Sequence, residues 1–525
     1  MPNFLDLPLD LTLQILPHLP ALSSFSQTCK SLRTITEPFL YSTIDLAWHG
    51  HKSTRRPPFR FLFRTIYERP DLAALVKHVH FSCVVGDDDE WAPGGTLHEV
   101  QLSPRDRKRV LAAIREAGWA FQNQAGKAVA EGDLDVLIAV LLSRLHNLEA
   151  LELGYGFVRL FDFVGRMLKH AISAPETAGN FSRFLKLREV RYSVNSDYAC
   201  LRKAASHTPQ PNFDQMTSLF SIPSLRTIDM VMPDSRGLAQ FPSNSSLPNL
   251  TVLRLRHSKL SVMTVQKMLK ATPRLEILQY DYVFDFEEWR EPHHHGWKNL
   301  SDALAFVSSS LKELTVSVDY INVEPYPPDD YNPEWILGTW RRRGDMGSLR
   351  GLASLEKLEI PLPILLGWDP SKGRTLREVL PTGIRELCLR DDLIDNNDYR
   401  WTPWGPFVPG SNAGSSFRET CNADPVLDQL RGYFGNRENR PATRSVCLKH
   451  RQGRLWPSGA QDQFRALCRE AGVLGKAVVR IGQERDPEEF RELAQEITLF
   501  DPADPEASRR GRYFKEPLQV LEYHF

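Results

Sequence analysis

Cysteine is scarce in this sequence, and no two cysteines are spaced as a C-x-x-C pair. The chain has seven cysteines in 525 residues, at positions 29, 83, 200, 388, 421, 447 and 468. A disulfide framework or a zinc ribbon needs closely spaced, repeated pairs. The scattered pattern therefore predicts reduced thiols, as in the cytoplasm or the nucleus, and no metal site.

The sequence also lacks a net charge and a long apolar run. Sixty-five basic residues balance sixty-five acidic ones, so no overall field draws the chain toward nucleic acid or an anionic membrane. The N-terminus contains Asp6 and Asp10 and has no basic start, unlike a signal peptide. The uncharged span 11–29 contains Pro17 and Pro20, which is not typical of a membrane helix. We expect no nucleic acid and no membrane among its partners.

Motifs of catalysis, cofactor binding and metal binding are missing as well. The run Gly154-Tyr155-Gly156 lacks the third glycine of a dinucleotide loop, since Arg159 stands there. The histidines at 293–295 have no companion ligand motif, and the acids at 87–90 lack the alternation of a calcium loop. There is no nucleophile elbow and no Walker loop. The sequence thus predicts a protein that is not an enzyme and has no cofactor.

The first forty residues, in contrast, carry a compact leucine-rich pattern. Pro8 suits the first turn of a helix, where its missing N–H is not needed. Apolar residues then recur on two helical faces, Leu9, Leu13 and Leu16 on one and Leu11 and Ile15 on the other. A second helical run follows, Leu22, Phe25, Cys29 and Leu32, and Pro38 closes the segment. So short a module cannot bury both faces by itself, so we expect part of its surface to meet a partner.

These residues resemble the F-box, the three-helix module by which substrate receptors of cullin-RING ubiquitin ligases bind the adaptor Skp1. The family pattern of Leu-Pro, an acid, Ile-Leu and a second Leu-Pro is matched by Leu7-Pro8, Asp10, Ile15-Leu16 and Leu19-Pro20. Its later part matches Thr28, Cys29, Leu32 and Arg33. Ser23 and Ser24 depart from the pattern, since many relatives have a charged residue followed by leucine there. The resemblance implies Skp1 contacts at Leu7, Pro8, Ile15, Leu16, Leu19 and Pro20.

A second pattern, apolar-x-x-Leu-x-x-Leu-x-Leu, recurs through the middle of the chain. Its second anchors, spaced by 25 to 44 residues, are Leu148, Leu187, Leu225, Leu250, Leu275, Leu311, Leu355 and Ile384. Each x-Leu-x-Leu end predicts a short strand whose alternate side chains enter a shared core. Helical periodicity precedes several of these strands, at 134–145, 262–269 and 300–307. The alternation predicts an α/β fold: an irregular leucine-rich-repeat solenoid of parallel strands with helices on its convex side.

An ordinary α/β domain with loosely similar units is the alternative. Most gaps exceed the usual repeat length, and no repeat has the asparagine or cysteine ladder position. The combination of an F-box with irregular repeats is similar to the F-box/leucine-rich-repeat receptors of filamentous fungi. That resemblance implies four regions: an F-box-like module at 1–48, a helical connecting region with a loop insertion at 49–132, the repeat array at 133–390, and an aromatic and polar loop with a C-terminal cap at 391–525.

Local signals outside the repeats predict further elements. Residues 103–131 form one or two helices that start at Ser103-Pro104 and stop at Gly132. Phe464, Leu467 and Cys468 indicate a helix that ends at Gly472 and is followed by a strand at 476–481. The Pro- and Gly-rich stretch 391–416 is typical of a long surface loop.

The resemblance implies a substrate-recognition subunit of an SCF-type (Skp1–cullin–F-box) ubiquitin ligase. Such a subunit binds a Skp1-like adaptor and, through it, a cullin, together with a protein substrate that the sequence does not identify. The alternative from another class is a non-catalytic leucine-rich-repeat scaffold that enters no ligase.

The x positions of the predicted strands point to the concave face, which solenoids use for recognition. They are Glu152, Arg191, Asp229, Arg254, Gln279, Thr315, Glu359 and Cys388. We expect the substrate there, with Arg191, Arg254 and Gln279 as candidate contacts. Trp401, in an aromatic segment after the last repeat, is a fourth candidate, because tryptophan is enriched at interfaces. The alternatives are that these aromatics only cover the end of the array, and that recognition lies in the insertion at 87–131.

Overall fold

The chain forms two compact units, one of residues 1–250 with 486–489 and the other of residues 251–485 with 490–525. The computed structural model describes residues 7–19, 21–49, 58–84, 100–154, 157, 162–173, 181–193, 218–231, 247–285, 296–321, 344–393, 401, 423–435, 441–450, 456, 458–483 and 492–504. Both units combine helices with mostly parallel strands, which confirms the predicted α/β class. The boundary between the units falls inside the predicted repeat array.

The first unit starts with a small helical module and continues as a ladder of strands. The module contains α1 (Leu9–Ile15), η2 (Leu16–His18), α2 (Leu22–Ser26) and α3 (Lys30–Leu40). The strands are β1 (Thr43–His49), β2 (His78–Val84), β3 (Ala150–Gly154), β4 (Glu189–Ser193) and β5 (Thr227–Val231). The helices between them are α4 (Phe59–Glu68), α5 (Pro70–Ala73), α6 (Pro104–Glu116), α7 (Gln122–Glu131), α8 (Leu134–Leu142), α10 (Phe163–Ser173) and η3 (Leu219–Ser221). Each strand pairs in parallel with the next along the chain.

The second unit repeats this arrangement with longer strands. Its strands are β6 (Val252–Ser258), β7 (Ile277–Asp285), β8 (Glu313–Ile321), β9 (Lys357–Pro361), β10 (Glu386–Arg390), β11 (Ser445–His450), β12 (Leu474–Gln483) and β13 (Glu492–Phe500). Its helices are α13 (Val262–Ala271), α14 (Trp297–Leu304), η6 (Ala305–Val307), α16 (Leu362–Leu366), α17 (Leu376–Val379), α18 (Asp424–Phe434) and α19 (Ser458–Ala471). Pairing is parallel from β6 to β12, and β13 pairs antiparallel with β12.

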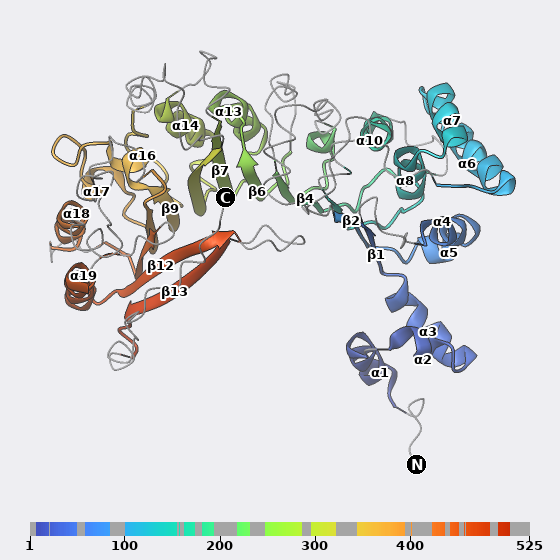
Figure 1. Cartoon of the computed structure of the whole chain (residues 1–525), viewed down its shortest axis with the longest axis horizontal. Helices are drawn as coiled ribbons and strands as arrows, with labels where there is room; N and C mark the ends of the chain where they lie inside the picture. The colour runs from blue at the N-terminus through green and yellow to red at the C-terminus, as the bar shows by residue number, and fades with distance from the viewer. Residues whose placement is uncertain are drawn as a thin grey trace, which may run out of the picture. The chain divides into compact units, whose positions relative to one another are not determined.

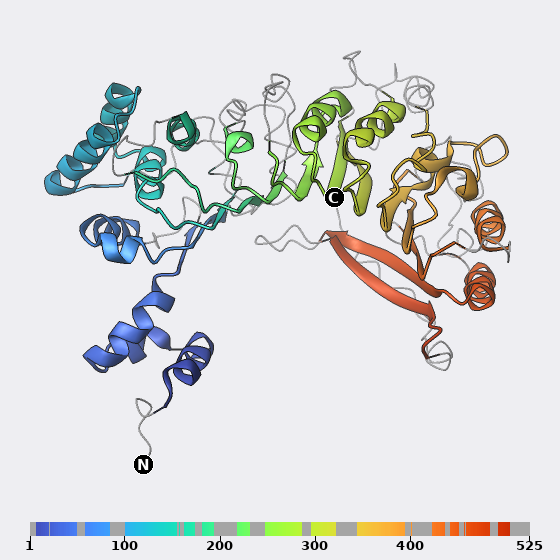
Figure 2. The same cartoon turned by 180° about the vertical axis from the view of Figure 1, so that it is seen from behind.

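Helices lie on one side of the strands in each unit, as α8 and α10 do in the first and α13 and α14 in the second (Figures 1 and 2). The leucines of the repeat pattern fill the space between the two layers. Nine leucines at the apolar positions of the repeat pattern are at most 1% exposed, as expected for a shared core: Leu148, Leu151, Leu250, Leu253, Leu255, Leu275, Leu278, Leu355 and Leu358. Helix, strand and core therefore alternate as the repeat pattern predicts, and the eight predicted repeat strands are β3 to β10.

The predicted helix boundaries follow from local capping. Ser103 Oγ accepts the N–H of Asp106 at 3.1 Å and starts α6, and Gly132 ends α7 in the left-handed region with a φ of 77°. Gly472, with a φ of 66°, follows α19 in the same way. The array also extends beyond its predicted limits, because β1 and β2 precede residue 133 and β11 and β12 follow residue 390.

Candidate functional site

The first candidate surface is formed by α1. Pro8 occupies its N-cap position with an extended backbone, and its carbonyl accepts the Thr12 hydroxyl at 3.2 Å. Thr12 and Leu16 lie four residues apart and are buried, at 4% and 0% exposure. Leu11 and Ile15, also four residues apart, are 48% and 39% exposed. The helix therefore turns one face into the chain and presents an apolar face to solvent.

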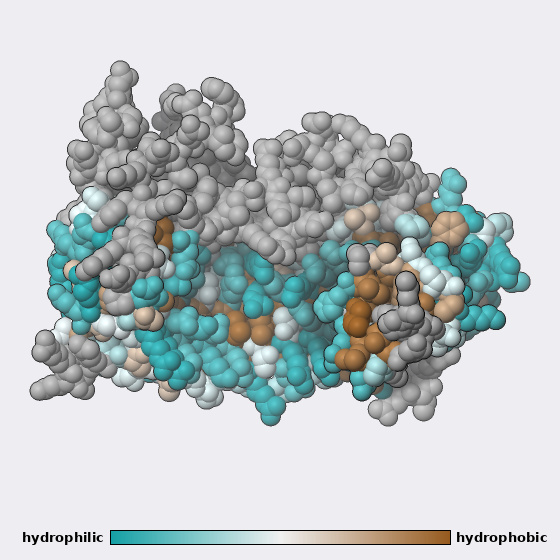
Figure 3. Space-filling model, turned by 90° about the horizontal axis from the view of Figure 1, so that it is seen from below, coloured by the Kyte–Doolittle hydropathy of each residue, from teal (hydrophilic) through white to brown (hydrophobic). Residues whose placement is uncertain are grey.

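Two further leucines of this segment are exposed, Leu7 and Leu13, each 38%, and Leu13 lies on another side of the helix from Leu11 and Ile15. We call Leu7, Leu11, Leu13 and Ile15 the α1 surface. Viewed from below, hydrophobic residues gather where α1 lies (Figure 3). Leu13 was expected on the same face as Leu16, but the α-helix ends at Ile15 and Leu16 starts a 3-10 turn. Leu16 is fully buried, whereas Leu13 is 38% exposed.

The structure distributes the six predicted adaptor contacts between surface and interior. Leu7, Pro8 and Ile15 are exposed, Leu19 is half-buried, and Leu16 is fully buried, so its side chain packs inside the chain instead of facing a partner. Pro20 lies outside the described residues. Leu11 and Leu13 were not among the predicted contacts, although the placement of Leu11 and Ile15 on a second apolar face already pointed to the first of them.

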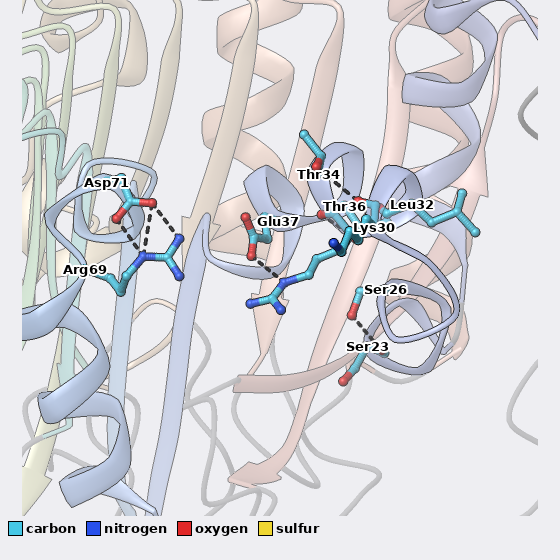
Figure 4. A network of polar contacts seen from close by, with 10 residues as sticks. Ser23, Ser26, Lys30, Leu32, Thr34, Thr36, Glu37, Arg69 and Asp71 are labelled. Atoms are coloured by element: carbon cyan, nitrogen blue, oxygen red, sulfur yellow. Dashed lines mark hydrogen bonds and ion pairs between the residues drawn. The ribbon is translucent and has the colours of Figure 1, made fainter.

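Short-range hydrogen bonds stabilise α3, the longest helix of the same module. Thr36 is buried in α3, and its hydroxyl donates to the Leu32 carbonyl at 2.8 Å (Figure 4). Cys29 Sγ accepts the Leu32 N–H at 3.5 Å at the start of the same helix. The Arg33–Glu37 pair, at 2.9 Å, joins successive turns of the same helix. Leu32 and Thr36 are thus fixed inside, and the exposed apolar side chains stand on an ordered support.

The second candidate surface is a row of side chains across the strands of the first unit. The register places Asp45, His80, Glu152, Arg191 and Asp229 next to one another, one from each of β1 to β5. We call this the first row. His80 lies between two carboxylates, with its Nδ1 3.2 Å from Asp45 and its Nε2 3.8 Å from Glu152. Burial alone would lower the pKa of Arg191, but the hydrogen bond to Glu189 and the nearby acids raise it.

The second unit carries the corresponding row. It consists of Arg254, Gln279, Thr315, Glu359, Cys388, Cys447 and Lys476, one from each of β6 to β12. We call this the second row. Gln279 Nε2 donates to Asp281 at 2.7 Å, and Asp281 also accepts the Ser317 hydroxyl at 2.7 Å. These bonds fix the polar side chains on the strand face.

A buried ion network borders the second row. Arg390 contacts Glu359 and donates to Asp392 at 2.8 Å, and Asp392 also accepts the Val318 N–H at 3.0 Å. Lys449 Nζ lies 3.0 Å from Glu359. Burial alone would raise the pKa of Glu359, but the charges of Arg390 and Lys449 lower it. The carboxylate is thereby held ionised within a largely buried cluster.

All eight predicted strand positions therefore lie in one of the two rows, and the rows gain members that were not predicted. Arg191, Arg254 and Gln279 belong to them, and each is half-buried or exposed. The repeat pattern did not identify four row members, because their strands lie outside the range predicted as repeats: Asp45, His80, Cys447 and Lys476. The alternation in residues 43–49 and 445–450 is the signal that could have found two of those strands.

Trp401, the fourth candidate for a substrate contact, lies in neither row. Its side chain is 0% exposed, and its Nε1 donates to the Gly367 carbonyl at 2.7 Å. It is therefore part of the interior of the second unit and not a surface contact, which agrees with the alternative that the aromatic segment covers the array. Tyr399, Trp404 and Phe407 of the same segment lie outside the described residues.

The described residues offer no metal or membrane site to add to these surfaces. Among them, no three His, Cys, Asp or Glu side chains gather as metal ligands. None of the helices in the described part is long and apolar enough to cross a membrane. The acids at 87–90 and the histidines at 293–295 lie outside the described residues.

Comparison of the chain with models of known protein families and with curated proteins finds no match. The α1 surface and the two rows are the features of the described residues that bear on function.

Proposed function

We propose that the chain is a substrate-recognition subunit of an SCF-type ubiquitin ligase. Residues 5–41 would bind a Skp1-like adaptor, which joins the chain to a cullin, and the two rows would bind a protein substrate. The chain itself would be a non-catalytic connector, working in the cytoplasm or the nucleus. The resemblance of its first forty residues to the F-box suggests this function, and the exposure of the α1 surface supports it.

The single observation that carries the proposal is where the exposed apolar residues lie. Eight large hydrophobic side chains are exposed in the described part of the chain, and four of them are the α1 surface, within residues 7–15. The other four are Phe61, Leu185, Met263 and Phe306, at separate places in the sequence. Single exposed apolar residues are ordinary, but a cluster on one short helix marks a contact surface.

The burial of the residues that match the F-box pattern suggests two different roles for them. Leu7, Pro8 and Ile15, with Leu11 and Leu13, would contact the adaptor, since these side chains are exposed. Leu16, Leu32 and Thr36 are buried and would support the module from inside. Polar substitution on the α1 surface should therefore weaken binding without unfolding the module, whereas substitution of Leu16 should do both.

The test is co-purification of the full chain with a Skp1 adaptor, followed by measurement of the dissociation constant. Leu11→Asp combined with Ile15→Asp should weaken binding by about a hundredfold, because each lost apolar contact contributes about 1.4 kcal/mol or more. Leu185→Asp is the matched control: Leu185 is 62% exposed but lies outside the module. Its affinity should equal that of the unmodified chain, and thermal unfolding should show that both variants are folded.

A folded double variant that binds the adaptor as tightly as the control would contradict the proposal. A chain that binds no Skp1 adaptor at all would favour the second class of function, a leucine-rich-repeat scaffold outside any ligase.

Substrate binding by the rows needs a separate test. Proteins captured by proximity labelling would be assayed for binding to Arg191→Glu and Gln279→Ala variants, which change one row each. Lys127→Glu on α7 is the control, since Lys127 is 81% exposed in the helical layer. Binding that is lost in a row variant and kept in the control supports recognition by that row. Equal binding by all three variants would place recognition elsewhere.

A further inference from the structure

Two thiols face each other across adjacent strands of the second unit. Cys388 on β10 and Cys447 on β11 are register partners, and both are half-buried members of the second row. Neither sulfur is engaged in a disulfide. The residues are 59 positions apart in the sequence, so their meeting is a consequence of the ladder and not of local spacing.

The separation of such a pair suits a covalent bond. Neighbouring strands lie about 4.8 Å apart, within the Cα separation of about 4.4–6.8 Å that disulfides require. Residues directly opposite in a parallel ladder point to the same side of the sheet, and the Cys388 thiol is hydrogen-bonded to Cys447. The ladder therefore places the two thiols on the same side of neighbouring strands, at a spacing that a disulfide can span.

The two sulfurs have different neighbours along the row. Glu359 is the register partner of Cys388 on one side of the pair, and Lys476 is the partner of Cys447 on the other. The hydrogen bond to Cys447, burial and the charge of Glu359 raise the pKa of Cys388, so this thiol keeps its proton. On the other side of the pair, Lys476 Nζ lies 2.6 Å from Glu496, so the neighbour of Cys447 is an ion pair and not an isolated carboxylate. Cys447 is therefore the thiol that attacks first, because Cys388 holds its proton more firmly.

We propose that Cys388 and Cys447 form a redox modification site at which a small-molecule disulfide, such as oxidised glutathione, is exchanged for a cross-strand protein disulfide. Cys447 loses its proton to solvent and attacks one sulfur of the small disulfide, forming a mixed disulfide and releasing one thiolate. Cys388 then loses its proton and attacks the Cys447 sulfur, releasing the second thiolate. Two protein thiols are oxidised, and one small disulfide is reduced to two thiols.

Two other cysteines provide internal controls. Cys468 is buried on α19, and burial raises its pKa to about 12. Cys29 is exposed at the start of α3. Neither has a cysteine as a strand partner, so neither is expected to form the same bond.

The test uses the reduced full chain, equilibrated with glutathione mixtures from fully reduced to fully oxidised. Free thiols are then alkylated, and the chain is digested and analysed by mass spectrometry. We expect a Cys388–Cys447 linked peptide with a loss of two hydrogen atoms, which dithiothreitol reverses. The oxidised chain should also melt a few degrees higher, because the bond closes a long loop. Cys447→Ser should abolish the linkage, whereas Cys29→Ser and Cys468→Ser should keep it.

Three results would overturn the proposal. Both thiols could remain open to alkylation in fully oxidised glutathione, one could stop at a stable mixed disulfide with glutathione, or either could link to a different cysteine. The mapping is made on the unmodified chain, so it decides the question even where a variant fails to fold.

Discussion

The polar rows of the two units stand on the same kind of parallel ladder, yet their charges lie in different surroundings. In the first unit, Asp45 and Arg191 are 68% and 52% exposed. In the second, Arg390 and Asp392 beside the row are 4% and 1% exposed. The difference arises where β10 ends, because the chain turns there and brings Asp392 to the N–H of Val318 on β8.

This difference separates charges that are available to a partner from charges that hold the fold. An exposed ion pair contributes little to stability, since water solvates its members almost as well when they are apart. A buried pair is costly to break, because the remaining charge has lost its water. The exposed members of the first row, Asp45 and Arg191, can therefore change their charges at small cost, and the network around Arg390 cannot.

The largest effect that we expect comes from breaking the buried network. Arg390→Ala removes the guanidinium from Glu359 and from the buried Asp392, and it should lower the free energy of unfolding by about 3–5 kcal/mol. Arg191→Ala, the matched change in the first row, should cost less than about 1 kcal/mol. Urea unfolding of both variants measures the two values. Equal losses would show that the rows do not differ in this way.

The pH dependence of stability should differ in sign between the units. Asp135 of α8 accepts the N–H groups of Asp162, Phe163 and Val164 at 2.7, 2.7 and 3.0 Å, but burial raises its pKa to about 8. Its contribution is therefore fully present below the ordinary aspartate pKa and is lost as the pH rises to about 8. The lowered pKa of Glu359 gives the reverse, a contribution present at neutral pH and lost in acid.

Two neutral variants sharpen this contrast. Asp135→Asn should cost about 1–3 kcal/mol in mild acid, because an amide cannot accept all three N–H groups, and the loss should shrink as the pH approaches 8. Glu359→Gln should be most harmful at neutral pH and least harmful in acid. Urea unfolding between pH 4 and pH 8 would measure both, and parallel curves for the two variants would refute the assignment.

Much of the array follows from the sequence, because each repeat carries its own signal. The leucines at 253, 255 and 278 alternate with polar residues, so the strand and its buried face are set locally. The pairing Arg254–Gln279 then follows from the repeat register. The α1 surface was partly predictable for the same reason, since Leu11 and Ile15 lie one helical turn apart.

Contacts between residues distant in sequence were not predictable in this way. The meeting of Cys388 with Cys447 depends on β11 being the next strand, although 59 residues separate the two cysteines. The burial of Asp392 depends on the turn that follows β10. Leu16 is buried although Leu13, placed on the same face by the spacing, is exposed, because burial in so short a module depends on which other helices pack against it.

Trp401 gives the smallest expected effect and decides between two roles for an aromatic residue in the second unit. Trp401→Phe keeps an aromatic ring in the interior but leaves the Gly367 carbonyl without its indole donor, which should cost about 1 kcal/mol beyond the loss of ring volume. Trp297→Phe is the control: Trp297 is 3% exposed, and its Nε1 has no hydrogen-bond partner within the described part of the chain. Each substitution lowers the free energy of unfolding by a measurable amount, and the difference between the loss for Trp401→Phe and the loss for Trp297→Phe gives the contribution of the hydrogen bond.

If Trp401 contacted the substrate instead, the Trp401→Phe variant would lose substrate affinity while remaining as stable as the control. Burial at 0% exposure predicts the opposite pattern, a loss of stability with unchanged affinity, because a side chain inside the unit supports the rows without touching what they bind.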